Sequence, residues 1–228
     1  MSLQAILFDC DGVIADSEEL WNEIDAEMLA HFGHPGYHGE LKPLVLGKSF
    51  TLSLEVYREQ FGLRVTAEEM LPVRIRVGAE VYRTRVPTFP GVHETLESLR
   101  ADGFRLALAT SSVSQLILPF LERHDIKRYF HAIVTGEMVR HGKPNPDIYL
   151  KAAAEVGVSP RESLVVEDAL AGLQAGRAAG ARTVAIPDER WGDPAQFVGA
   201  ADFIVADLPA VLPLIDGLRR GSLPGESG

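Results

Sequence analysis

Six short apolar runs, separated mostly by segments with helical spacing, constrain the fold of this 228-residue chain more than any other feature. The runs do not alternate polar with apolar residues, which is typical of strands buried on both faces of a parallel sheet. Strands and helices alternate from about Pro90 onward, and this order predicts a parallel sheet with helices on both faces. The predicted strands are 5–8, 106–109, 132–135, 164–166, 183–186 and 203–205.

The first predicted strand stands apart, because the segment that follows it is helical in pattern. Apolar residues recur at helical spacing over 20–32, and further amphipathic stretches lie near 52–61 and 67–82. Asp16 followed by Glu19 predicts a capping box at the start of the first helix. The sequence thus predicts an α/β fold with a Rossmann-like parallel sheet formed by 1–15 and 87–220, an inserted all-helical cap domain at 16–86 and a flexible Gly/Ser-rich tail at 221–228.

The charge balance argues against nucleic acid and anionic membranes as partners. Lysine and arginine number 22 against 32 acidic residues, so the formal net charge is −10, and such a field repels phosphate backbones and acidic lipid surfaces. Cys10 is the single cysteine, which excludes an internal disulfide or a multi-cysteine zinc site and suits a reducing compartment. No apolar run approaches the ~20 residues of a membrane span. We therefore expect a cytoplasmic protein without nucleic-acid or membrane partners.

Acidic, hydroxyl and lysine side chains follow several of the predicted strands. The carboxyl ends of parallel strands meet at one edge of the sheet, where ligands bind. Carboxylates gathered there would repel one another by about 4 kcal/mol per pair at 4 Å and an effective dielectric of 20, so they need a cation. Oxygen ligands without histidine or thiol favour Mg²⁺, and a nearby lysine and hydroxyl suit phosphoryl transfer. The residues are Asp9, Asp11, Thr110, Ser111, Ser112, Lys143, Glu167 and Asp168.

In chain order, these residues resemble the four motifs of the haloacid dehalogenase-like (HAD) superfamily. The motifs are Asp9-Cys10-Asp11-Gly12-Val13, Thr110, Lys143 and Glu167-Asp168, and the resemblance runs from Ile6 to about Leu218. The helical insert after the first motif is similar to that of the subgroup containing β-phosphoglucomutase and phosphoglycolate phosphatase. The resemblance implies a magnesium-dependent phosphatase, a phosphoric monoester hydrolase that acts on a small phosphorylated metabolite such as a sugar phosphate or a phosphoglycolate-like compound.

The same resemblance implies a role for each matching residue. Asp9 is expected to attack phosphorus and become a transient aspartyl phosphate, while Asp11 protonates the leaving alkoxide and then activates water. Thr110 and Ser111 are expected to hold the phosphate oxygens, and Lys143 to offset the charge on Asp9 and the phosphoryl group. The implied Mg²⁺ ligands are Asp9, the Asp11 carbonyl, and Asp168 with Glu167 nearby.

Simpler interpretations of single residues stay open at this stage. Asp168 could cap the helix that follows it, Lys143 could be an ordinary solvated lysine, and Asp9 and Asp11 could be turn residues. Only their joint placement at strand ends favours the catalytic interpretation over these.

The predicted cap bears on whether the enzyme hydrolyses a phosphate ester or isomerises it. Where the mutase of the resembling subgroup has a histidine and an arginine, this chain has Trp21 and Phe50. A mutase must hold a second phosphate, and losing that bidentate cation favours hydrolysis. A β-phosphoglucomutase-like phosphomutase is the alternative, and a phosphorylated receiver-type switch is a weaker one. Lys48 and Ser49 are the candidate cap contacts to the substrate.

Overall fold

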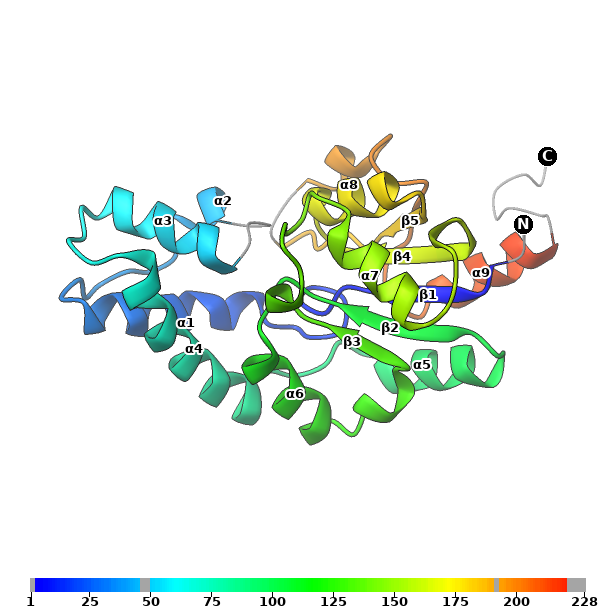
Figure 1. Cartoon of the computed structure of the whole chain (residues 1–228), viewed down its shortest axis with the longest axis horizontal. Coiled ribbons are helices and arrows are strands. Elements are labelled where there is room, and N and C mark those ends of the chain that lie inside the picture. The colour runs from blue at the N-terminus through cyan, green and yellow to red at the C-terminus, as the bar shows by residue number, and fades with distance from the viewer. Residues whose placement is uncertain (1–2, 46–49, 191–192, 221–228) are drawn as a thin grey trace.

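The computed structural model describes residues 3–45, 50–190 and 193–220, which form a parallel six-stranded sheet flanked by helices and a group of cap helices beside it (Figure 1). All neighbouring strands are parallel, in the order β3-β2-β1-β4-β5-β6. The strands are β1 (Ala5–Phe8), β2 (Arg105–Ala109), β3 (Ala132–Val134), β4 (Ser163–Glu167), β5 (Arg182–Ala185) and β6 (Phe203–Ile204).

All six predicted strands are confirmed, with bounds that move by one residue at some ends. The four inner strands are almost entirely buried, as their unbroken apolar runs predict. The two edge strands differ, because β3 and β6 are short and partly exposed. An edge strand has a neighbour on one side only, so fewer groups cover it.

Alternate residues of the strands face two separate hydrophobic clusters, as the period of a strand requires. Ile6 and Phe8 belong to the cluster covered by α5, α6 and α9, and Ala5 and Leu7 to the cluster covered by α7 and α8. Figure 1 shows α7 and α8 on one side of the sheet and α5 and α6 on the other. These helices are α5 (Val92–Ala101), α6 (Ser114–Arg123), α7 (Asp147–Glu155), α8 (Leu170–Ala179) and α9 (Val211–Arg220).

Four cap helices lie between β1 and α5 in the chain and extend away from the sheet (Figure 1). They enclose a hydrophobic cluster of their own, which includes Met28, Leu54 and Met70. Helix α4 also packs on α6, where a Cβ on Gly78 would lie 3.1 Å from Leu116 Cδ2. The cap helices are α1 (Glu18–His31), α2 (Lys42–Val45), α3 (Phe50–Gln60) and α4 (Ala67–Thr84). Within the described ranges, each helix is too short or too polar to cross a bilayer.

The predicted capping box at the start of α1 is wrong. Helix α1 begins at Glu18, and its N-cap residue, Ser17, makes no side-chain capping bond. The Ser17 hydroxyl instead donates to Asp11 Oδ1 at 2.7 Å, and Asp16 Oδ1 accepts from Arg190 Nη2 at 2.7 Å. Tertiary partners therefore compete with the local cap for both side chains.

Candidate active site

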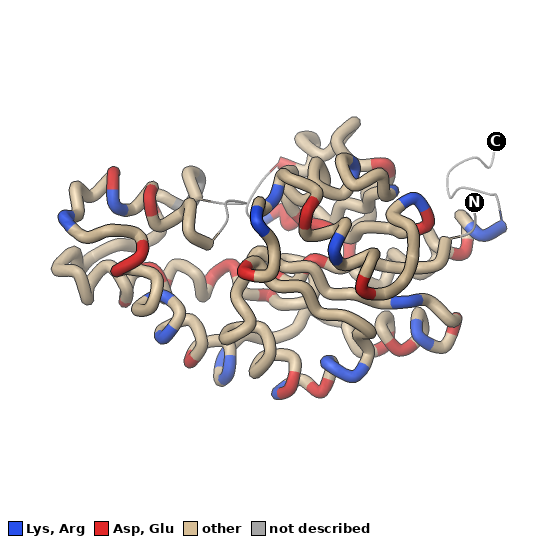
Figure 2. Tube along the Cα trace, in the orientation of Figure 1, with Lys and Arg blue, Asp and Glu red and all other residues tan. Residues whose placement is uncertain are grey.

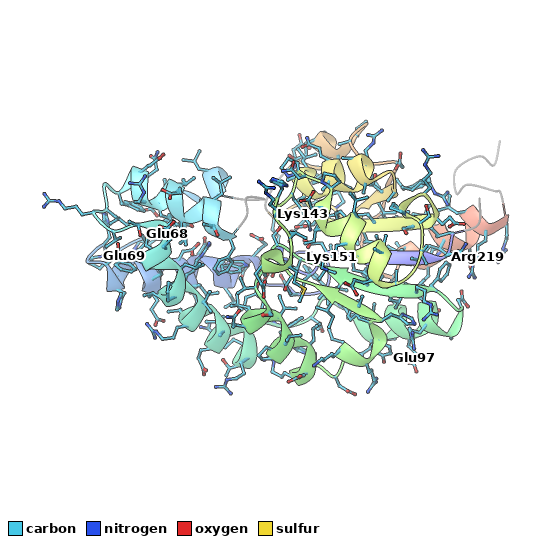
Figure 3. The ribbon with its side chains drawn as sticks, viewed as in Figure 1. Glu68, Glu69, Glu97, Lys143, Lys151 and Arg219 are labelled. Atoms are coloured by element: carbon cyan, nitrogen blue, oxygen red, sulfur yellow. The ribbon has the colours of Figure 1, made fainter. Side chains whose placement is uncertain are left out.

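The strand register brings the predicted site residues to one edge of the sheet. Phe8 of β1 pairs with Leu108 of β2 and with Val166 of β4, so the residues that follow these three strands emerge side by side. Lys143 lies at the end of the sheet nearer the cap helices, whereas Arg219 lies at the opposite end (Figure 3). Acidic and basic positions are otherwise spread over the whole trace (Figure 2), so anion binding depends on local arrangement.

Lys143 joins two of the strand ends through its ammonium group. Its Nζ donates to Asp9 Oδ1 at 2.7 Å and to Glu167 Oε1 at 2.6 Å, and it lies 3.2 Å from the Ala109 carbonyl oxygen. Burial alone would lower the pKa of Lys143, but the charges of Asp9 and Glu167 outweigh burial and raise that pKa above its usual range. Lys143 therefore stays protonated, and the interpretation of it as a solvated surface lysine is wrong.

Three carboxylates crowd together beside Lys143. One oxygen from each of Asp9, Glu167 and Asp168 lies within 4.8 Å of the others. Burial raises the pKa of Asp9 to about 8, although Lys143 opposes the shift. Burial and the neighbouring Glu167 also raise the pKa of Asp168. The single ammonium leaves this cluster short of positive charge, and an all-oxygen donor set of this kind fits a hard divalent cation.

Glu167 is held in place by contacts that the sequence did not predict. Tyr149 of α7 donates its hydroxyl to Glu167 Oε1 at 2.5 Å, and the Ala169 amide lies 3.3 Å from Oε2. Gly172 of α8 leaves room for the carboxylate, because a Cβ there would lie 1.8 Å from Oε1. The glycine in α8 therefore has a local reason, since any side chain would displace Glu167.

Asp11 points to a different set of partners. Its Oδ1 accepts hydrogen bonds from Ser17 and from Tyr82 of α4, and its Oδ2 accepts from Ser112 Oγ at 2.7 Å. The carboxylate is not part of the acidic cluster of Asp9, Glu167 and Asp168. The resemblance implied the carbonyl of Asp11, rather than its carboxylate, as a metal ligand, and that role stays a prediction. Burial and the charge of Asp11 raise the pKa of Tyr82, so its hydroxyl is the donor.

The partners of Asp11, which are Ser17, Tyr82 and Ser112, were not predicted from the sequence. Ser112 was expected at the sheet edge without this contact, and Tyr82 ends the apolar face of a predicted helix. The contacts of Asp11 with these residues depend on how the segments that join the cap to the sheet are folded.

The Thr110 side chain is buried beside Asp11. Its Oγ1 accepts a hydrogen bond from the Ser112 amide at 3.0 Å and lies 3.5 Å from Asp11 Oδ2.

A cavity of about 510 Å³ opens between the sheet edge and the cap. Sheet residues including Asp9, Thr110 and Ser111 line one part of it, and cap residues including Trp21 and Phe50 line the other. Every described site residue predicted from the sequence borders this one cavity. Lys48 and Ser49, the predicted cap contacts, lie outside the described residues.

Comparison with known proteins gives a consistent result. The family described as haloacid dehalogenase-like hydrolase matches residues 6–186. A phosphorylated carbohydrates phosphatase from Thermotoga maritima is 32% identical over 178 residues, covering 78% of this chain and 82% of that protein. Hexitol phosphatase B from Escherichia coli K12 is 29% identical over 207 residues, covering 90% of each chain. A solved structure from Thermotoga maritima, provisionally named β-phosphoglucomutase, has a TM-score of 0.74 at 28% identity and covers 95% of this chain and 100% of that one.

Proposed function

This chain belongs to the haloacid dehalogenase-like hydrolase family and is a phosphoric monoester hydrolase, and we propose that it uses Mg²⁺ and an aspartyl phosphate on Asp9 to hydrolyse a small phosphorylated metabolite. The observation that carries the proposal is the position of Lys143 Nζ, 2.7 Å from Asp9 Oδ1 at the edge of the cavity. A carboxylate can approach a phosphate dianion only where positive charge offsets their repulsion, and this ammonium supplies part of it.

Asp9 acts as the nucleophile in this proposal. A carboxylate oxygen of Asp9 forms a bond to phosphorus while the bond from phosphorus to the ester oxygen breaks. Thr110, Ser111 and the amides that follow bind the phosphoryl oxygens, and Lys143 orients Asp9. The departing oxygen becomes the hydroxyl of the alcohol product.

Asp11 carries the protons in this proposal. It donates one to the departing oxygen and then takes one from the water that attacks phosphorus, so phosphate leaves and Asp9 is regenerated. Hydrogen bonds from Ser17, Tyr82 and Ser112 hold the Asp11 carboxylate. Because Tyr82 belongs to cap helix α4, the position of the cap influences the orientation of the proton carrier.

Asp9, Asp168 and the Asp11 carbonyl would hold the Mg²⁺ ion, with Glu167 beside them. When bound, the ion would offset negative charge on Asp9 and on the phosphoryl group. Magnesium suits oxygen ligands and keeps part of its coordination for water or phosphate.

Magnesium is expected to stabilise the substrate-free protein more at pH 8 than at pH 5. The folded, metal-free protein holds a proton on Asp9 up to a pKa of about 8, whereas the unfolded chain releases it near its ordinary value. The stabilisation from this proton is full below the ordinary pKa and is lost as the pH rises through about 8. At pH 5 the proton competes with the ion, and at pH 8 the ion replaces it.

Thermal unfolding with and without Mg²⁺ measures this effect. Saturating Mg²⁺ should raise Tm by about 5 °C at pH 8 and by less at pH 5. Asp168→Asn should abolish the shift, while Asp216→Asn, an exposed position on α9 outside the cavity, should retain it. An equal shift at both pH values, or none at pH 8, would contradict the assignment of the ion to this cluster.

Phosphorus NMR of a sugar monophosphate incubated with the protein tests the proposed hydrolysis. The sugar phosphate signal should decay into inorganic phosphate, and adding EDTA in excess of Mg²⁺ should stop the conversion. Trp21 and Phe50 border the cavity at the positions where the resembling mutase has a histidine and an arginine, and the Arg74 guanidinium beside their rings is already paired with Asp25, which supports hydrolysis. An isomeric phosphate ester formed without free phosphate would show a phosphomutase instead, and turnover that survives EDTA would exclude the metal.

A further inference from the structure

The cap side of the cavity contains a buried ion pair that the proposed chemistry does not use. Arg74 of α4 donates from Nε to Asp25 Oδ1 at 2.8 Å and from Nη2 to Asp25 Oδ2 at 3.1 Å. Both side chains are buried, with exposed fractions of 6% for Arg74 and 4% for Asp25. Both also border the same cavity as Asp9. This bidentate pair places the negative charge of Asp25 directly against the guanidinium of Arg74.

The remaining donors of Arg74 are also largely occupied. Nη1 donates to the Phe50 carbonyl oxygen at 2.9 Å and to Ser53 Oγ at 2.5 Å. Together with the two bonds to Asp25, these use four of the five N–H groups of a guanidinium. The rings of Trp21 and Phe50 lie 4.9 and 4.7 Å from its central carbon. Arg74 therefore has no free pair of N–H groups with which to bind a phosphate or carboxylate of the substrate in bidentate fashion.

The rest of the described cavity wall is poor in positive charge. Its basic residues are Arg74 and Lys143, and Lys143 already lies between Asp9 and Glu167. Asp25 keeps acceptor capacity beyond its bonds to Arg74 and Tyr57. Asn22, whose amide can both donate and accept, borders the same part of the cavity. Among the described residues of the cavity wall, these groups suit hydroxyls and offer no unpaired cation to a second anion.

We propose that the substrate is a phosphate monoester whose remaining part is uncharged and rich in hydroxyl groups, and that Asp25 enforces this choice by neutralising Arg74. The inference rests on the proposed phosphatase function and narrows it, because it disfavours phosphoglycolate-like esters and bisphosphates. Asp25 acts through Arg74, so it is a positioning residue that determines selectivity.

Two matched substrates test the inference in the unmodified protein. Glucitol 6-phosphate and 6-phosphogluconate have chains of equal length and differ at the far end, which is a CH₂OH group in one and a carboxylate in the other. With Mg²⁺ present, kcat/KM should be about 100-fold higher for glucitol 6-phosphate, because a carboxylate in the cap would face like charge. Hydrolysis of p-nitrophenyl phosphate, which has no hydroxyl-bearing tail, is measured in parallel.

Two substitutions should reduce this preference by adding net positive charge to the cap. Asp25→Asn leaves the Arg74 guanidinium uncompensated, and Asn22→Lys places an ammonium on a half-buried position of the cavity wall. Each should lower the ratio of the two kcat/KM values by about tenfold, mainly through a lower KM for 6-phosphogluconate. Ala30→Lys adds the same charge to an exposed position of α1 outside the cavity and should leave the ratio unchanged.

The possible results separate the inference from the function on which it rests. Hydrolysis of p-nitrophenyl phosphate, together with equal or better use of 6-phosphogluconate, would overturn the inference and leave the phosphatase intact. Absence of hydrolysis for all three esters would overturn the proposed function itself. Asp25→Asn removes half of a buried ion pair and is the variant at risk of misfolding. Within the described part of the chain Asn22 makes no hydrogen bond or ion pair that Asn22→Lys would break, so an unchanged ratio in that variant alone would contradict the inference.

Discussion

Replacing Asp9 with asparagine should lower kcat by about four orders of magnitude or more, as expected when a covalent nucleophile is lost. The amide has nearly the size of the carboxylate but lacks the negative charge that attacks phosphorus. Lys143 keeps its 2.6 Å contact with Glu167, so the fold should survive. Steady-state rates on p-nitrophenyl phosphate, combined with Tm, measure the two effects separately.

The control for Asp9→Asn is Asp216→Asn, which neutralises an exposed acid of α9 outside the cavity and should keep the rate within about twofold. Mass spectrometry of the variant confirms that the asparagine has not deamidated back to aspartate. A residual rate within tenfold of the unmodified protein would exclude Asp9 as the nucleophile.

Lys143→Met should lower both activity and stability by large amounts. Methionine keeps much of the length of the lysine side chain but leaves Asp9 and Glu167 buried without their shared cation. We expect kcat/KM to fall by about 10³-fold and the free energy of unfolding by about 3–5 kcal/mol at pH 8. The stability loss should shrink at pH 5, because Asp9 is then protonated in the folded state.

Lys151→Met is the matched control, since Lys151 lies on α7, is partly exposed and pairs with Glu155 at 3.2 Å. A surface pair of this kind contributes about 0–1 kcal/mol, so rate and stability should stay close to those of the unmodified protein. Urea unfolding at both pH values and kcat/KM for both variants provide the comparison. Near-normal activity in Lys143→Met would show that the ammonium does not support the attack of Asp9.

The sequence was sufficient to predict the sheet and the grouping of polar residues at its edge, because both follow from local pattern. Buried parallel strands appear as continuous apolar runs, and their carboxyl ends meet at one edge whatever the rest of the fold does. Asp9, Lys143 and Glu167 could therefore be placed together without knowing a single contact between them. The edge strands β3 and β6 are more exposed than the four inner strands, because each has a neighbouring strand on one side only.

The contacts that orient the site depend on tertiary packing and could not be predicted in this way. Tyr149 reaches Glu167 from the first turn of α7, and Tyr82 reaches Asp11 from the last turns of α4. Neither spacing indicates a contact until the helices are packed on the sheet. The capping box predicted at Asp16 failed for the same reason, because Asp16 pairs with Arg190 and the actual N-cap residue, Ser17, bonds to Asp11. The Asp25–Arg74 pair joins α1 to α4 across 49 residues of sequence, and no local pattern predicts it.

The most direct test of the proposed mechanism is to locate the phosphoryl group on the protein during turnover. Rapid acid quenching of the enzyme with substrate and Mg²⁺, followed by borohydride reduction and peptide mass spectrometry, should convert phosphorylated Asp9 to homoserine in the peptide that contains it. The Asp9→Asn variant should yield no such product. Borohydride reduction at a residue other than Asp9 would contradict the proposed mechanism. Release of phosphate before the steady state, with Asp9 unmodified throughout, would contradict it as well.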